Sequence, residues 1–174
     1  GSGEPTAAFR QFIGGQQAGM ADFTALFAPN VNSYQRLCHP YASPNNACWS
    51  HDNRAAGLRI PASFAVARRV ENRLPGADAN PYLAIAASLA AGLHGIEHQL
   101  EPTAAIQGEF DVPEALSLPC TLHAALERLK RSHLAIELFG KEFIEGYIAS
   151  KTLELTSFYD EITPWERRVL AAQA

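Results

Sequence analysis

The chain of 174 residues is 47% hydrophobic and 18% charged, which is typical of one folded domain and excludes a disordered tail. Its formal net charge of -4 gives no overall attraction to phosphate backbones or anionic lipid, so we expect neither nucleic acid nor a membrane as a partner. The cysteines at 38, 48 and 120 contain no CxxC pair and cannot all form disulfides, which favours a reducing compartment and a cytoplasmic protein.

The N-terminal third is expected to be mainly helix and loop. Residues 1–4 begin with Gly-Ser-Gly, which lacks the features of a signal peptide and resembles the remnant of an expression tag, so we assign the fold to residues 5–174. Apolar residues at helical spacing predict a first helix from Phe9 to Phe27, with Gly14-Gly15 as a candidate break. Residues 30–44 are rich in Asn, Ser and Pro without a sustained period, which predicts a long ordered loop.

The middle of the chain carries the strand signals. Residues 47–51, 56–60 and 67–74 are expected to pair into a small sheet. Asn80 as an N-cap followed by Pro81 predicts a helix to about Leu100, which is apolar almost all round and should be central. Its apolar stretch is shorter than the roughly 20 residues of a membrane-spanning helix.

The C-terminal third reads as amphipathic helices over residues 121–130, 132–139 and 141–159, with a short final helix beginning at Thr163. The predicted fold class is therefore α+β, with a small antiparallel sheet packed against a mainly helical C-terminal region.

The residues between 53 and 73 are rich in arginine. If residues 67–74 form a strand, Arg69, Glu71 and Arg73 point to one face, so that one carboxylate is flanked by two guanidinium groups. Arginine forks match carboxylates and phosphates, and a carboxylate among them could hold Mg²⁺. The same pattern fits a salt-bridge ladder on a solvated sheet face, and spacing alone does not decide between the two.

Four segments, in order along the chain, resemble consecutive signatures of the glutamine synthetase family. They are Asn32-Ser33-Tyr34-Gln35-Arg36-Leu37, Trp49-Ser50-His51-Asp52-Asn53-Arg54, Arg68-Arg69-Val70-Glu71-Asn72-Arg73 and Ala77-Asp78-Ala79-Asn80-Pro81-Tyr82-Leu83. The Asp52-Asn53-Arg54 and Pro164-Trp165-Glu166 forms are closer to the γ-glutamylpolyamine synthetase branch. The resemblance implies the C-terminal part of a catalytic domain that joins an amine to the γ-carboxyl of glutamate, with ATP and Mg²⁺ or Mn²⁺ as cofactors.

Roles follow from the resemblance residue by residue. It implies that Arg36 and Arg73 bind the carboxylates of glutamate, and that Arg54, the catalytic residue, contacts both the glutamyl group and the ATP phosphates. Arg59 would also face the phosphates, and Arg69 would lie on the nucleotide side. Glu71 matches a ligand of the metal ion that bridges the phosphates. In such phosphoryl transfer, positioning and charge neutralisation supply most of the catalysis.

The sequence departs from the glutamine-forming members at two places. Residues 38–44 contain no acid where those members carry a glutamate that helps to deprotonate ammonium, which favours a larger amine as the acceptor. Residues 64–67 lack the lysine that precedes the paired arginines in those members.

The segments that carry the family's other metal-binding glutamates lie upstream in the resemblance. Because Mg²⁺ needs near-octahedral oxygen ligands, we expect this chain to be an inactive fragment. The resemblance also implies that the full-length parent is a homo-oligomer that forms rings. The alternative is a non-catalytic binding or regulatory module that keeps the synthetase-like fold.

Two further groups of residues are weighed as sites. His94, Glu97 and His98 spell H-x-x-E-H, a zinc-protease pattern. Gly95 inside the motif, the lack of a defined third ligand, and the position at the end of an apolar helix whose start matches the synthetase pattern argue against a protease. His39 in the loop is interpreted as a solvated side chain, and the three cysteines as structural.

Overall fold

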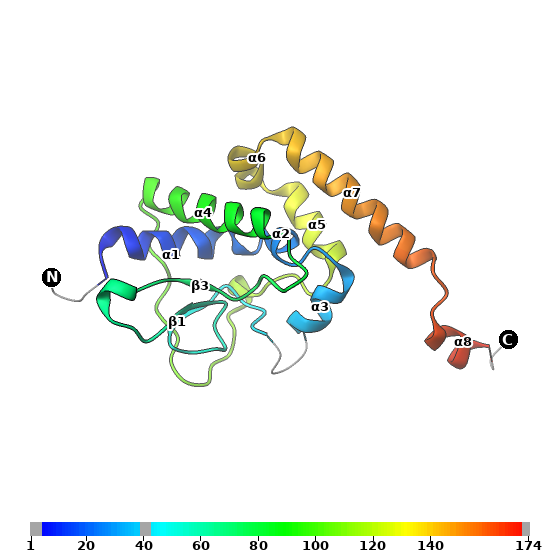
Figure 1. The fold of residues 1–174 in the computed structure, drawn as a ribbon, viewed down its shortest axis with the longest axis horizontal. Helices are drawn as coiled ribbons and strands as arrows, with labels where there is room; N and C mark the ends of the chain where they lie inside the picture. The colour runs from blue at the N-terminus through cyan, green and yellow to red at the C-terminus, as the bar shows by residue number, and fades with distance from the viewer. Residues whose placement is uncertain (1–4, 39–42, 172–174) are drawn as a thin grey trace.

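The computed structural model describes residues 5–38 and 43–171. The expected tag remnant at residues 1–4 and the loop histidine His39 lie outside this range. Figure 1 shows helices α1 and α4 running side by side over the small sheet, while α7 extends away from the body and carries α8 at its far end. No helix of the described chain is long and apolar enough to cross a membrane.

Helix α1, Ala7–Met20, packs against α4, Pro81–Glu97, with their backbones in close contact. The expected break at Gly14-Gly15 is absent, because these glycines serve packing instead. A Cβ atom on Gly15 would lie 2.1 Å from the carbonyl oxygen of Ala91 and 2.6 Å from the Cα atom of Gly95. The absence of side chains therefore lets the two helices meet, at a position where a larger residue would push them apart.

Helix α4 begins as predicted, with the side chain of Asn80 accepting hydrogen bonds from the first turn. Its inner face is buried, whereas its outer face exposes large apolar side chains at helical spacing: Tyr82, Ile85, Leu89 and Leu93. The prediction that α4 is central is therefore wrong for its outer face. Apolar residues show which sides of a helix could be buried, but they do not show which sides another element packs against.

The polar segment after Pro29 was expected to be a loop, and that prediction is wrong for residues 31–38, which form helix α3, Val31–Cys38. The hydroxyl of Ser33 accepts a hydrogen bond from the Asn30 N–H at 3.1 Å, which supports the first turn. Tyr34 and Leu37 bury one side of the helix. Two buried apolar residues at helical spacing thus outweigh a loop-like composition.

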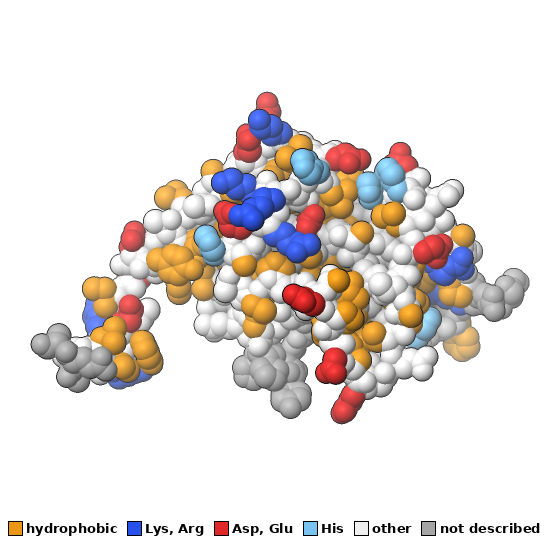
Figure 2. All heavy atoms as spheres, turned by 180° about the vertical axis from the view of Figure 1, so that it is seen from behind, with side chains coloured by type: hydrophobic (Ala, Val, Ile, Leu, Met, Phe, Trp, Pro, Cys, Tyr) orange, Lys and Arg blue, Asp and Glu red, His pale blue; other side chains and the backbone are white. Residues whose placement is uncertain are grey.

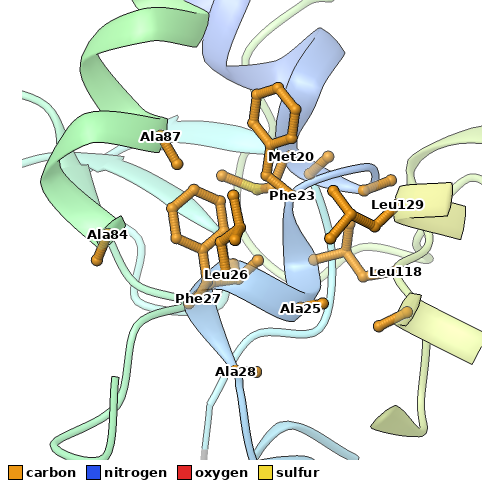
Figure 3. Packing of buried hydrophobic residues seen from close by; sticks show 14 of the residues in the cluster. Met20, Phe23, Ala25, Leu26, Phe27, Ala28, Ala84, Ala87, Leu118 and Leu129 are labelled. Carbon is orange, nitrogen blue, oxygen red and sulfur yellow. The ribbon is translucent and has the colours of Figure 1, made fainter. Parts of the chain in front are cut away.

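The core lies where α1, the short helix α2, Thr24–Phe27, and the C-terminal helices meet (Figure 3). Phe23 and Phe27 are fully buried there, together with Leu129 of α5. The ring of Phe23 meets Phe139 edge-on, with 5.4 Å between the centroids. The predicted single helix over residues 9–27 is interrupted after Met20, so that this aromatic cluster can form.

The sheet has three short strands in the order β1, Trp49–His51, β2, Leu58–Ile60, and β3, Glu71–Asn72. Strands β2 and β3 pair antiparallel as expected, but β1 and β2 pair parallel, so the sheet is mixed. A three-residue strand spans only about 10 Å, so the short segment 52–57 can return the chain to its start without a helical crossover.

The third predicted strand is shorter than expected. Residues 65–67 form a 3₁₀ turn, and only Glu71–Asn72 pairs with β2. Strand alternation therefore does not position residues 67–70.

The C-terminal helices are confirmed with bounds close to the prediction: α5, Leu122–Arg131, α6, His133–Phe139, α7, Lys141–Asp160, and α8, Pro164–Leu170. Hydroxyl caps begin three of them, and at α8 Thr163 and Glu166 form a complete capping box. A second 3₁₀ turn, Glu114–Leu116, precedes them. The α+β class is confirmed, with a small sheet beside a mainly helical C-terminal region.

Candidate active site

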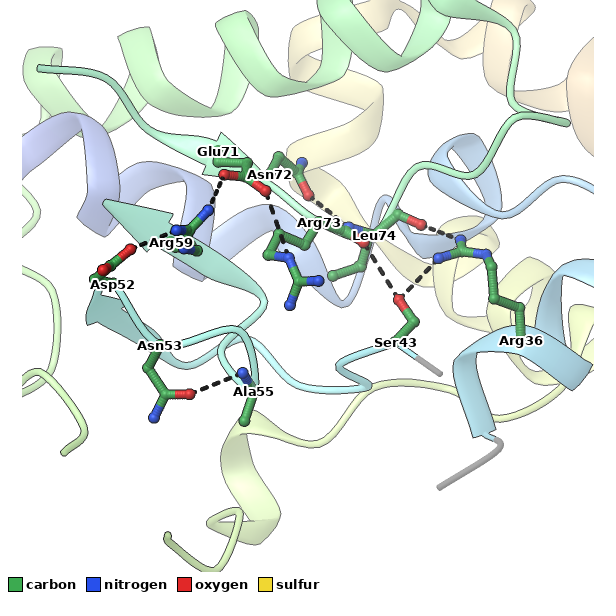
Figure 4. Close-up of polar contacts among 10 residues, drawn as sticks. All are labelled: Arg36, Ser43, Asp52, Asn53, Ala55, Arg59, Glu71, Asn72, Arg73 and Leu74. Atoms are coloured by element: carbon green, nitrogen blue, oxygen red, sulfur yellow. Dashed lines mark hydrogen bonds and ion pairs between the residues drawn. The ribbon is translucent and has the colours of Figure 1, made fainter. Parts of the chain in front are cut away.

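The centre of the candidate site is a carboxylate between two guanidinium groups. Strand register places Arg59 of β2 directly opposite Glu71 of β3, and Arg59 Nη1 donates to Glu71 Oε2 at 2.8 Å (Figure 4). Arg73 Nε lies 3.5 Å from Glu71 Oε1. The expected arrangement is present, but Arg59 takes the place that alternation along one strand gave to Arg69.

Asp52 is a second carboxylate of the cluster, which the sequence interpretation quoted in a motif without giving it a role. It follows β1 with a φ of 50°, a left-handed conformation that turns the chain back toward β2. Its Oδ1 accepts a hydrogen bond from Arg59 Nη2. That bond is the main cause of the lowered pKa of Asp52, with smaller contributions from the charges of Arg59 and Arg54.

Arg54 and Arg73 bring further positive charge to the same place. Burial lowers the pKa of the Arg73 guanidinium; the charge of Glu71 opposes this, and the charges of Arg59 and Arg54 add to it. Arg54 is therefore within electrostatic reach of Arg73, although its side chain is exposed. Three arginines against two carboxylates leave a net charge of +1 in the cluster.

Arg36 adjoins this cluster from helix α3. Its Nη1 donates to Ser43 Oγ at 2.8 Å and its Nη2 donates to the carbonyl of Leu74 (Figure 4). Ser43 Oγ in turn donates to the carbonyl of Arg73 at 3.4 Å. The guanidinium of Arg36 is thus tied to the backbone that carries Arg73, and a Cβ on Gly76 would lie 3.1 Å from its Nε.

Arg69 lies outside the cluster. Its side chain is exposed and its Nη1 donates to the carbonyl of Ala67 at 3.5 Å, within its own segment. Nothing in this local geometry directs it toward Glu71. Its role on the nucleotide side therefore rests on the family resemblance alone.

The donor set fits an anion. Arg36 Nε, Arg59 Nε and Arg73 Nη1 are buried and have no hydrogen-bond partner among the residues that the structure describes. Unpaired buried donors cost free energy, so oxygen atoms of a phosphate or carboxylate that reached them would be favoured. Within the described part of the chain, Glu71 Oε1 makes only the 3.5 Å contact with Arg73. Mg²⁺ typically takes one or two carboxylates plus substrate phosphates. Glu71 therefore fits one ligand of a magnesium ion shared with phosphates.

The edge of this mixed sheet gathers arginines and carboxylates, and guanidinium groups of this kind suit carboxylate or phosphate ligands. A family model described as the catalytic domain of glutamine synthetase matches residues 1–170. The chain belongs to this glutamine synthetase family.

Relatives within the family include enzymes named for amines other than ammonia. The γ-glutamylethanolamide synthetase of Streptomyces coelicolor is 40% identical over 91% of this chain and 34% of its own length. The glutamate–isopropylamine ligase of a Pseudomonas species is 39% identical over 89% of this chain and 34% of its own length. The γ-glutamylputrescine synthetase of Escherichia coli is 39% identical over 94% of this chain and 35% of its own length. The chain spans about a third of the length of these relatives.

Proposed function

We propose that this chain is the C-terminal part of the catalytic domain, over residues 5–174, of an ATP-dependent ligase that joins the γ-carboxyl of glutamate to an amine. The observation that carries the proposal is the contact of Arg59 and Arg73 with Glu71 across β2 and β3. Family membership supports the reaction class, because the relatives are named as synthetases and ligases of γ-glutamyl amides.

In the proposed reaction, the γ-carboxylate of glutamate attacks the γ-phosphorus of ATP, ADP leaves, and an amine then displaces phosphate from the γ-glutamyl phosphate. Arg36 and Arg73 hold the carboxylates of glutamate. Arg54 and Arg59 neutralise phosphate charge, with Arg69 on the nucleotide side, so that the reacting atoms approach without repulsion. Mg²⁺ or Mn²⁺, held partly by Glu71, supplies further charge neutralisation when bound.

The acceptor is proposed to be a primary amine larger than ammonia. Residues 38–44 provide no carboxylate to bind or deprotonate ammonium. Three relatives carry names that refer to ethanolamine, isopropylamine and putrescine amides. A larger amine would gain binding energy from contacts that ammonia cannot make.

The test is phosphate release by the full-length protein with glutamate, ATP and one amine at a time. Ethanolamine, putrescine and isopropylamine are expected to give higher kcat/KM than ammonia, and mass spectrometry should show the matching γ-glutamyl amide. A preference for ammonia would contradict the acceptor proposal alone. Phosphate release without dependence on glutamate would contradict the ligase.

Three subordinate proposals concern the state of the protein. The chain of residues 1–174 alone should not release phosphate, because it supplies too few carboxylates for the metal ions. The full-length protein should form a homo-oligomer, which analytical ultracentrifugation would detect. It should also be found in the cytoplasmic fraction of its cell, which cell fractionation would test.

A further inference from the structure

Two histidines and a glutamate come together away from the arginine cluster. His94 and His98 lie one turn apart at the C-terminal end of α4, and Glu137 comes from α6. One ligand atom from each of the three side chains lies within 4.8 Å of the other two. In the space-filling view, histidine and acidic side chains adjoin near one edge of the molecule (Figure 2).

The side chains are oriented by their surroundings. His94 Nδ1 lies 3.9 Å from Glu137 Oε1, and the ring centroids of His94 and His98 lie 4.0 Å apart. His98 Nδ1 lies 3.0 Å from the carbonyl of His94, which can only accept a hydrogen bond. Nδ1 of His98 therefore carries the proton in this contact, and its Nε2 keeps the lone pair that a metal needs.

The structure removes two of the arguments that the sequence raised against a zinc site here, namely Gly95 and the lack of a third ligand. Gly95 does not weaken the motif, because it is required for the contact with α1: a Cβ there would lie 2.2 Å from the carbonyl oxygen of Gln11. The missing third ligand is Glu137, which is 39 residues from His98 and was invisible to a local motif. Glu97, the acid of the protease pattern, is exposed and does not join the group.

We propose that His94, His98 and Glu137 form a binding site for a divalent transition-metal cation, and that the bound ion is Zn²⁺. Two imidazoles and one carboxylate suit Zn²⁺, whereas Mg²⁺ and Ca²⁺ prefer oxygen ligands alone. Ligand atoms around a tetrahedral zinc lie about 3.3 Å apart, so small side-chain rotations would close the site. Water completes the coordination, because His98 and Glu137 are exposed.

The bound ion would connect α4 to α6. The side chain of His94 is 15% exposed while that of Glu137 is 62% exposed, so the site is open to solvent on the side of α6. Zinc that bridges them would stabilise the folded chain in proportion to its occupancy. This site is separate from the proposed ligase site and does not depend on that assignment.

The test is isothermal titration of the chain with Zn²⁺ in excess Mg²⁺, which occupies oxygen-rich sites. Cys38 and Cys120 must be controlled first, because Asn45 Nδ2 lies 3.8 Å and 3.0 Å from their sulfurs and the pair could itself bind zinc. All variants are therefore made in a Cys38→Ser background. His98→Ala and Glu137→Gln test the site, and His123→Ala on an exposed part of α5 is the matched control.

One equivalent of Zn²⁺ is expected to bind and to raise the melting temperature relative to chelator. His98→Ala and Glu137→Gln should each weaken binding roughly tenfold or more, whereas His123→Ala should not. Substitution of Co²⁺ should give the visible absorption of a four-coordinate ion that both variants lose. Absence of binding, or binding that both variants retain, would overturn the proposal. Both positions are exposed, so circular dichroism is expected to show folded variants.

Discussion

Glu71 joins two guanidinium groups that differ in what else they contact. Among the described residues, Arg59 is shared between Glu71 and Asp52, while Arg73 makes only the longer contact with Glu71, and each guanidinium keeps one nitrogen unpaired. Arg73 is therefore the more available of the two for an incoming carboxylate, and Arg59 is the more strongly held in place. This inequality predicts different consequences for substitutions at the two positions.

Arg73→Lys in the full-length protein should raise the KM for glutamate roughly tenfold or more, with a smaller effect on the KM for ATP. Lysine keeps the charge but loses the fork that matches a carboxylate. Steady-state kinetics measures both constants. Arg10→Lys, at an exposed pair with Glu101 remote from the cluster, is the control. An unchanged KM for glutamate would contradict the role of Arg73.

The pKa of Asp52 should lie below the usual aspartate value of about 3.9, because Arg59 stabilises the charged carboxylate. A lowered folded-state pKa adds stability that is present above the unfolded-state pKa and is lost as the pH falls through the folded-state pKa. Carbon-detected NMR titration measures the value directly. Arg59→Met should raise the pKa of Asp52 toward its usual value, and no change would contradict the pairing.

Among the elements, the crossing of α1 and α4 depends on glycine for a steric reason. Gly15 and Gly95 face each other so closely that neither has room for a methyl group. By contrast, a Cβ on Gly146 in α7 would meet no other part of the described chain within 4 Å, apart from its own helical turn, and the position is exposed. The same substitution at the two sites should therefore change stability in opposite directions.

Gly15→Ala should lower the free energy of unfolding by about 1–3 kcal/mol, because α4 must move away from α1. Gly146→Ala should raise it by about 0.5–1 kcal/mol, since alanine loses less backbone entropy in a helix. Urea unfolding followed by circular dichroism measures both. If Gly15→Ala were as stable as the parent chain, the tight crossing of these helices would be wrong.

The elements also show what the sequence could predict. Helices α5 to α8 were predictable because apolar spacing and hydroxyl caps are local signals. Helix α3 was missed because its polar composition hides the buried pair Tyr34 and Leu37. The parallel pairing of β1 with β2 is a non-local choice that no periodicity records.

The candidate site likewise contains residues that the sequence could predict and residues that only the tertiary structure shows. The carboxylate and its arginine-rich segment were visible in the sequence. The partner Arg59 required the register of two strands, and Glu137 required the packing of α6 near α4. Local patterns thus gave part of each site, and tertiary structure added Asp52 to the first and Glu137 to the second.

At the scale of the molecule, the outer face of α4 departs from a buried core. Tyr82 is 84% exposed and Leu93 is 60% exposed, with Ile85 and Leu89 between them on the same side. Four large apolar side chains in a row form a continuous patch, unlike the single exposed hydrophobic residues that are normal on protein surfaces. Such a patch favours association of the chain with itself.

The isolated chain should self-associate in a concentration-dependent way, and the double substitution Leu89→Glu and Leu93→Glu should shift it toward the monomer. Burying this face removes apolar area from water, whereas two carboxylates there would have to lose their hydration in any contact. Sedimentation velocity over a range of concentrations measures the effect. Leu153→Glu, at a residue of α7 that is 70% exposed and apart from the patch, is the matched control and should leave the association unchanged. If both variants behaved alike, another surface would be responsible for the association and the α4 face would have no part in it.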